Sequence, residues 1–385
     1  MMWYVALLLT VRLSRFLSSM APPVVLPIAE TMFEMAHRFA PEKPMLKPRV
    51  IVRIPFHISY LQLTSPSPQL ITGVTGALGS HILSYLFNLP PQTPPLTQII
   101  CLLRGNNAST RLAAALQARH LKKPCPLDPP GPPDSLTPTL QVTTAQLHDP
   151  KLGLRHAVYR DLLDSVTDII HCAWPVNFLA PLESFSHALL GLKNLLTLAQ
   201  GCGAHFLYAS SIASVLAAPH NGVMREMPST RPEDATPLGY SRSKWVAERI
   251  VLQHGGDVVR IGQLSGNRGD GVWNEDEAWP QMVRHSVEMG AMPMLSHGET
   301  VAWLPVDLAA EAVANIALER CLRGERLGKV WHVVNVRKVE WSVVLEALSS
   351  WSNGGVKGVE TQEWLEMLRK RNGVKLLDLW ENAVS

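Results

Sequence analysis

Three glycines at positions 73, 76 and 79 place the tightest constraint on how this chain can fold. They lie in the segment ITGVTGALGSHIL, directly after a short apolar run and at the start of a stretch with helical spacing. A strand, a tight glycine-rich turn and a helix in this order are typical of a dinucleotide-binding site. The first glycine permits the turn, the second lets the pyrophosphate approach, and the third allows close helix–strand packing. We therefore expect cofactor contacts from this segment, namely from Thr72, Gly73, Thr75, Gly76, Ala77, Leu78 and Gly79.

Short apolar runs alternate with helical patterns along the rest of the chain. We predict strands at 70–72, 98–103, 167–171, 205–210 and 257–261, and helices at 77–89, 108–121, 182–200 and 240–253. Such alternation is typical of a parallel sheet covered by helices on both faces. The expected fold class is α/β, a Rossmann-like doubly wound parallel sheet with a smaller C-terminal part.

The end of the second predicted strand indicates which nicotinamide cofactor is bound. A site for NAD usually has Asp or Glu about 20 residues after the glycines, where it binds the ribose 2′-hydroxyl. This chain instead has Arg104 and Arg111, with no acidic residue between Gly73 and Lys123. Two arginines suit a 2′-phosphate, so NADPH is the predicted cofactor. The alternative is that both arginines are solvated surface residues.

A second motif suggests proton-transfer chemistry. Tyr240 and Lys244 are four residues apart at the start of a predicted helix, so they project from one face of it. An ammonium group there would lower the pKa of the tyrosine. Ser211 lies just past a predicted buried strand, at the sheet edge where ligands bind, and could bind a substrate carbonyl. The alternative for Tyr240 is an ordinary residue of an amphipathic helix.

Composition excludes several classes of protein. The chain is 46% hydrophobic, which is enough for a large core, and its net charge of +3 is too small and too dispersed to indicate nucleic-acid binding. The five cysteines lack CxxC spacing, so we predict no metal site and no disulfide framework, and a reduced cytoplasmic protein. The apolar run at 3–11 is too short to span a membrane.

Longer segments resemble a known family. They are DIIHCAWPVNF (168–178), FLYASSIASV (206–215), GYSRSKWVAERI (239–250), VVRIGQLSGNRGDGVWNEDEAWP (258–280), WLPVDLAAE (303–311) and VWHVVN (330–335). With the glycine loop and Tyr240/Lys244, they are similar to extended short-chain dehydrogenase/reductases. More specifically, they resemble the C-terminal thioester reductase domain of fungal nonribosomal-peptide-synthetase-like adenylate-forming reductases, over about residues 70–370.

The resemblance implies NADPH-dependent reduction of an acyl thioester on the phosphopantetheine arm of a carrier domain, released as an aldehyde or possibly an alcohol. It implies a catalytic trio of Ser211, Tyr240 and Lys244, with Tyr240 as proton donor and Lys244 also holding the nicotinamide ribose. His171, Cys172 and Ala173 would line the pocket near that ribose, and Gln263 the nicotinamide end. Cys172 replaces the usual Asn, and Gln146-Leu147 replaces an Asp-Leu pair at the adenine.

These observations divide the chain into an atypical N-terminal segment (1–68), an NADP-binding domain (69–265) and a mainly substrate-binding part (266–385). Within the first segment, residues 28–40 could form one amphipathic helix, and residues 49–69 could be a gene-model artefact. Because adenylation and carrier domains are missing, we expect a carrier supplied in trans. The alternatives are a free-standing reductase or epimerase for a small molecule or acyl-CoA, and a non-catalytic relic.

Three tryptophans and three charged residues outside the motifs have roles that the sequence also suggests. Trp273, Trp279 and Trp303 could shape an aromatic acyl pocket or belong to the core. Glu248 and Arg249 are interpreted as a solvated helix face, and Asp307 as the N-cap of a helix that runs through Leu318.

Overall fold

The computed structural model describes residues 25–41, 68–89, 96–122, 138–219, 223–295, 298–323 and 328–371. Its centre is a sheet of seven parallel strands, in the spatial order β11-β6-β5-β4-β1-β2-β3. The strands are β1 (Pro68–Thr72), β2 (Gln98–Leu103), β3 (Thr139–Thr144), β4 (Asp168–His171), β5 (His205–Ser211), β6 (Asp257–Ile261) and β11 (Val330–Val333). The predicted α/β class with a Rossmann-like parallel sheet is therefore confirmed.

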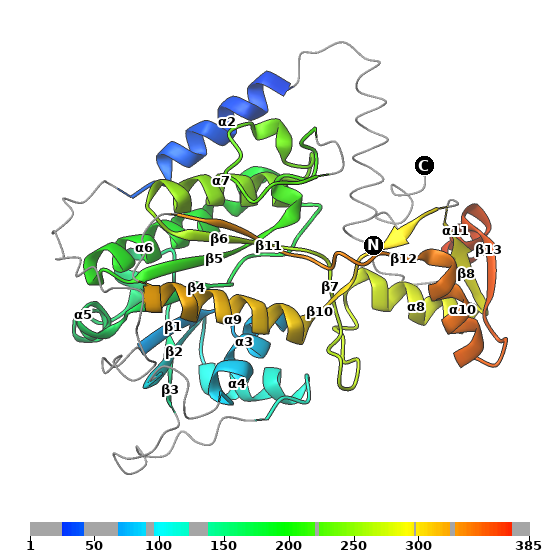
Figure 1. The fold of residues 1–385 in the computed structure, drawn as a ribbon, viewed down its shortest axis with the longest axis horizontal. Helices are drawn as coiled ribbons and strands as arrows, with labels where there is room; N and C mark the ends of the chain where they lie inside the picture. The colour runs from blue at the N-terminus through cyan, green and yellow to red at the C-terminus, as the bar shows by residue number, and fades with distance from the viewer. Residues whose placement is uncertain are drawn as a thin grey trace.

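Helices cover both faces of this sheet (Figure 1). One face carries α3 (Ala77–Phe87), α4 (Ala108–Gln117) and α9 (Val306–Arg323), and the other carries α5 (His156–Ser165), α6 (Ser186–Cys202) and α7 (Gly239–Gln253). Burial on both faces explains why strands such as β4 and β6 have every residue buried. The predicted helix at 182–200 differs in detail, because its first turn is the 3₁₀ helix η2 (Leu182–Phe185) and α6 then continues to Cys202.

The strand order reverses direction between β1 and β4, which are hydrogen-bonded neighbours. Ligands of open parallel sheets bind at the carboxyl ends of the strands beside such a switch point. Thr72 of β1 is in register with His171 of β4, and Ser211 of β5 with Ile261 of β6. The predicted site residues on these strands therefore lie along one edge of the sheet.

The helix predicted at 28–40 is present as α2 (Val25–Arg38) and packs on α7 (Figure 1). Its buried face consists of Met32, Met35 and Ala36, followed by Phe39, and joins the core on that side of the sheet. This part of the N-terminal segment therefore extends the α/β core. The remainder of that segment, including the apolar run at 3–11 and most of 49–69, lies outside the described residues.

The C-terminal third of the chain contributes to two bodies. Helix α9 and strand β11 return to the main sheet, with β7 (Leu264–Ser265) and β10 (Leu304–Pro305) paired where the chain crosses over. The smaller body has its own core around Trp279, Trp341 and Trp364. It consists of α8 (Ala278–Met289), β8 (Ala291–Met294), β9 (Thr300–Val301), β12 (Val339–Glu340), α10 (Trp341–Trp351), β13 (Lys357–Glu360) and α11 (Thr361–Arg369).

Two elements beyond the predicted boundary at residue 266, the helix α9 and the strand β11, thus belong to the α/β core and not to the smaller body. Among the described residues, no helix combines the length and the apolar character that crossing a bilayer requires.

Candidate active site

The glycine loop between β1 and α3 has the conformation that its sequence predicts. Gly73 has φ +78°, and a Cβ there would lie 2.7 Å from the backbone N of Ala173 on the neighbouring strand end. A Cβ on Gly79 would lie 2.3 Å from the carbonyl oxygen of Gly73, so only glycine lets α3 approach the turn. Gly76 forms the N-cap of α3 without a side-chain cap, which leaves the N–H groups of the first turn available to an anion.

A cleft of about 270 Å³ opens above this loop, at the carboxyl ends of β1, β2 and β4. Eight of the predicted cofactor residues line it: Gly73, Thr75, Gly76, Arg104, Arg111, His171, Cys172 and Ala173. Gln146 does not, although its neighbour Leu147 does. Thr72 is fully buried beneath the cleft, where its Oγ1 lies 2.7 Å from Nδ1 of His171.

The two arginines occupy the end of the cleft next to β2. Arg111 donates a hydrogen bond to the carbonyl oxygen of Arg104, so its guanidinium is partly engaged in holding the strand end. Arg104 is exposed beside Gly105. Sequence reasoning missed His148 and His187, whose rings lie 5.0 Å apart in an edge-on arrangement and line the same cleft. They come from segments far apart in the sequence, and neither belongs to a motif.

Ser211, Tyr240 and Lys244 meet at the end of β5. Tyr240 and Ser211 share a side-chain hydrogen bond. The Nζ of Lys244 donates to the carbonyl oxygen of Ala209 at 2.7 Å. The same Nζ lies 4.6 Å from the ring centroid of Tyr208, and 4.9 Å from that of Trp174. All three predicted catalytic side chains are buried, and two aromatic rings surround the ammonium group.

Burial dominates the electrostatics of this trio. It raises the pKa of Tyr240, and the hydrogen bond with Ser211 lowers it only in part. Burial also lowers the pKa of Lys244 to about 7, against the opposing effects of Cys172 and Glu248. The prediction that Lys244 lowers the tyrosine pKa is therefore wrong for this structure, because desolvation of the phenolate is the larger effect.

Trp174 connects the end of β4 to α7. Its Nε1 donates to Oγ of Ser243 at 3.1 Å, and that hydroxyl donates to the backbone oxygen of Tyr240 at 2.6 Å. The indole ring also lies edge-on to His171 and Tyr208. Trp174 was not among the predicted site residues. The signal that could have found it is its place in the segment that follows the buried strand β4.

Two buried polar atoms fit a bound nicotinamide cofactor. Nε2 of His171 and Oε1 of Gln263 have no hydrogen-bond partner among the described residues. Buried polar atoms are usually paired, so an unpaired one calls for an explanation. Burial and the nearby Lys244 lower the pKa of His171 to about 3, so the imidazole is neutral. The other buried nitrogen of this ring is engaged with Thr72, and Cys172 carries a thiol whose pKa burial raises to about 12.

Several sequence interpretations outside the trio need correction. Glu248 is buried and ion-paired with Arg260, with Oε2 to Nη2 at 2.8 Å. Arg249 packs over the ring of Phe33 from α2, so neither residue belongs to a solvated face. Asp307 lies inside the first turn of α9 and accepts hydrogen bonds from the backbone and side chain of Arg268, so it is not the N-cap.

The three tryptophans pack together. Trp279 is edge-on to Trp303 at a centroid distance of 4.8 Å, and Trp303 to Trp273 at 5.5 Å. Trp279 is buried in the core of the smaller body, and the other two pack against that core. Of the two alternatives, the structure favours core packing.

The chain is similar in sequence to a known protein family and to parts of larger enzymes. The family model described as "Male sterility protein", a NAD-binding domain, matches residues 71–313. The chain is 33% identical over 299 residues to the iterative polyketide synthase afoE of Emericella nidulans, which covers 73% of the chain and 10% of that protein. It is 29% identical over 320 residues to the adenylate-forming reductase stbB of Stachybotrys bisbyi, covering 77% of the chain and 28% of that protein. The chain thus spans less than a third of these relatives.

Solved structures share the fold. The terminal R domain from the myxalamid PKS-NRPS pathway aligns with a TM-score of 0.73 at 24% identity, over 93% of this chain and 86% of that one. A thiolation-reductase di-domain from an archaeal non-ribosomal peptide synthetase aligns with a TM-score of 0.65 at 19% identity, over 83% and 67%. At these identities the similarity establishes the α/β architecture.

Proposed function

The chain belongs to the NAD-binding family described as "Male sterility protein", and from this membership we propose that it is an NADPH-dependent thioester reductase. The observation that carries the proposal is the hydrogen-bonded pair Ser211–Tyr240, with Lys244 on the same helix face, beside a cleft floored by the glycine loop. A bound nicotinamide cofactor supplies a hydride. The protein must then place an electrophilic carbonyl next to a proton donor.

Ser211 and Tyr240 are suited to act on that carbonyl oxygen. The Ser211 hydroxyl orients the carbonyl, and the Tyr240 phenol donates its proton as the oxygen gains negative charge. A raised tyrosine pKa keeps this proton in place until the oxyanion develops. After hydride addition, the carbon–sulfur bond breaks, the hydroxyl proton returns to Tyr240 as the aldehyde forms, and the leaving thiolate takes up a proton from solvent. The sum consumes one NADPH and one proton.

The preference for NADPH rests on the positive charge at the cleft end beside β2. Arg104 is free of side-chain partners among the described residues and could form charge-assisted hydrogen bonds to a 2′-phosphate. Arg111 would contribute less, because it already donates to Arg104. The unpaired Nε2 of His171 and Oε1 of Gln263 are polar atoms that the ribose and the carboxamide could satisfy.

The substrate that we propose is an acyl group on the phosphopantetheine arm of a carrier domain supplied in trans. Relatives named as polyketide synthases and adenylate-forming reductases support this class. A thioester accepts hydride more readily than a carboxylate, because it carries no negative charge and has a thiolate leaving group. The smaller C-terminal body, at the open end of the sheet, would bind the acyl group.

The test follows NADPH oxidation with three forms of one acyl group: the free acid, its N-acetylcysteamine thioester, and the thioester on a carrier protein. We expect rates to rise in that order, because binding energy from the remote arm positions the reacting carbonyl. Turnover of the free acid at a comparable rate without ATP would contradict the proposal. So would activity confined to a ketone or a sugar nucleotide, which would favour a free-standing reductase.

Tyr240→Phe tests whether Tyr240 is the proton donor. The ring still packs against Phe178, but the proton donor is lost, so kcat should fall about 10²- to 10⁴-fold while NADPH binding is unchanged. A variant with near-normal kcat would show that Tyr240 is not the proton donor.

A further inference from the structure

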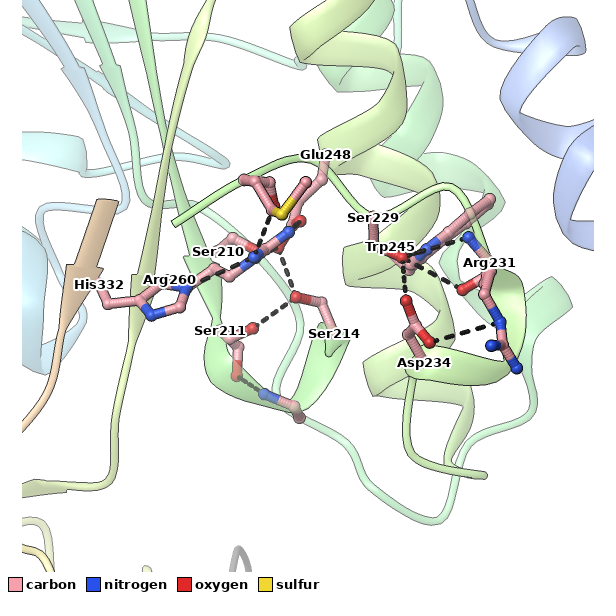
Figure 2. Close-up of polar contacts among 12 residues, drawn as sticks. Ser210, Ser211, Ser214, Ser229, Arg231, Asp234, Trp245, Glu248, Arg260 and His332 are labelled. Carbon is pink, nitrogen blue, oxygen red and sulfur yellow. Dashed lines mark hydrogen bonds and ion pairs between the residues drawn. The ribbon is translucent and has the colours of Figure 1, made fainter. Parts of the chain in front are cut away.

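A buried acidic side chain lies directly behind the candidate catalytic serine. Glu248 of α7 is 3% exposed. Its Oε1 accepts hydrogen bonds from Oγ of Ser210, at 2.5 Å, and from Oγ of Ser214. Its Oε2 accepts from Nε and Nη2 of Arg260, at 3.0 and 2.8 Å. Figure 2 shows this cluster, with Ser211 next to the two serines that reach the carboxylate.

The other side of Arg260 is also held. Its Nη1 donates to the carbonyl oxygen of Met227 at 3.1 Å and lies 3.4 Å from Nε2 of His332 on β11. The guanidinium is 1% exposed and comes from β6, next to β5 in the sheet. Glu248 is therefore fixed on one side by the sheet, and it fixes the two serines on its other side.

Glu248 is the third residue on one face of α7 that contacts the end of β5. Tyr240, Lys244 and Glu248 are spaced by four residues along one face of the helix. They contact three consecutive residues of the strand: Tyr240 meets Ser211, Lys244 meets Ala209, and Glu248 meets Ser210. Tyr240 and Glu248 thus contact two neighbouring residues of β5, Ser211 and Ser210, from the same face of the helix.

The contacts between α7 and β5 also reach the turn that follows β5. Residues Ile212–Ser214 form the 3₁₀ helix η3, and the backbone N–H of Ala213 donates to Oγ of Ser211 at 3.2 Å. Oγ of Ser214 also lies 2.8 Å from the carbonyl oxygen of Ser211. The Ser211 hydroxyl thus contacts the backbone of η3, and the last residue of η3, Ser214, donates a hydrogen bond to Glu248.

We propose that Glu248 is a positioning residue, which acts through Ser210 and Ser214 to hold the Ser211 hydroxyl in register with Tyr240. Only the expected effect on catalysis rests on the proposed function. The positioning of the Ser211 hydroxyl does not. A buried ion pair adds little net stability compared with apolar residues of the same volume. The Glu248–Arg260 pair instead fixes the position of the Glu248 carboxylate. This carboxylate is then a rigid hydrogen-bond acceptor for Ser210 and Ser214.

The test removes the two serine contacts and leaves the ion pair intact. The variants are Ser210→Ala, Ser214→Ala and the double variant, since Glu248→Gln leaves Arg260 buried without its counter-ion and could prevent folding. The matched control is Ser229→Ala. Oγ of Ser229 donates to a carboxylate of Asp234 at 2.7 Å and accepts from Nε1 of Trp245 at 2.9 Å. This second cluster, at the right of Figure 2, touches another face of α7.

The first readout is amide hydrogen exchange of residues 211–215, which requires no activity. We expect faster exchange at Ala213 in the Ser210 and Ser214 variants and no change in Ser229→Ala. The second readout is kinetic. With the carrier-bound thioester, kcat should fall about 10- to 100-fold, the scale of a small misplacement of reacting groups. The NADPH Kd and the KM should stay unchanged, with a loss in Tm no greater than that of the control.

The outcomes separate this inference from the proposed function. Unchanged exchange at 211–215 in the double variant would overturn the inference, whether or not the protein reduces thioesters. An equal fall of kcat in Ser229→Ala would also overturn it, because the effect would then be general loss of stability. Exchange that increases as expected in a chain inactive on every thioester would support the positioning and reject the proposed reaction.

Discussion

Arg104 is the residue on which we expect the proposed preference for NADPH to depend most. It lines the cleft end beside β2, and among the described residues its side chain makes no contact comparable to the one that engages Arg111. A charge-assisted hydrogen bond contributes about 1.5–3 kcal/mol, which corresponds to roughly one to two powers of ten in affinity. Arg104→Ala should therefore remove most of the preference for NADPH over NADH, and dissociation constants for both cofactors would measure it.

The control for Arg104→Ala is Arg160→Ala. Arg160 is an exposed arginine of α5 that does not line the cleft, so its removal changes the net charge equally and should leave the preference intact. Equal affinities for NADPH and NADH in the unmutated protein would show that Arg104 is one of the solvated arginines that the sequence also allowed.

His171 makes the stability of the protein depend on pH. Burial, with a contribution from Lys244, lowers its pKa from 6.5 to about 3. Between these two values the unfolded chain binds a proton that the folded chain excludes. The free energy of unfolding should therefore fall as the pH decreases through this window, by up to about 1.4 kcal/mol per pH unit from this group.

The measurement is urea unfolding at several pH values for the unmutated protein and for His171→Gln. The variant keeps a polar group next to Thr72 but has no proton to bind, so its free energy of unfolding should fall less steeply between pH 6.5 and pH 3. Carboxylates contribute to both proteins equally and cancel in the difference. Identical slopes would mean that the folded protein accommodates a protonated imidazole.

Helix α2 is the element whose contribution can be tested most simply. Met32 is 1% exposed and packs in the core shared with α7. Met32→Ala should lower the free energy of unfolding by about 2–5 kcal/mol, the usual cost of truncating a buried methionine. Glu34→Ala, on the exposed face of the same helix, should change it by less than about 0.5 kcal/mol. Equal effects of the two substitutions, measured by chemical denaturation, would show that α2 does not stabilise the fold.

The elements near the cofactor could be predicted from sequence because their signals are local. The strands 98–103 and 257–261 coincide with β2 and β6, and the glycine loop has the predicted turn. Local signals do not say which distant elements meet. The approach of His148 to His187 and the return of β11 to the sheet depend on tertiary packing that no spacing in the sequence records.

Glu248 shows where a sharper prediction was possible. A glutamate on a helix is usually solvated, which is why its burial was missed. The sequence does place Arg260 directly after two valines in the strand DVVRI, and a charge in a buried strand requires a partner. That partner is the third residue in the four-residue series Tyr240, Lys244, Glu248. The pairing follows from these two facts together, although neither is sufficient alone.

At the scale of the whole molecule, we expect a hydride to pass to a thioester carbonyl that lies between the glycine-loop domain and the smaller C-terminal body. The most direct measurement uses NADPH with deuterium in both C4 positions and an acyl thioester on a carrier protein. The product is trapped with a hydrazine and analysed by mass spectrometry. We expect the unmutated protein to form an aldehyde that carries one deuterium on its carbonyl carbon, and Tyr240→Phe to form almost none. An aldehyde or acid released without deuterium would contradict it.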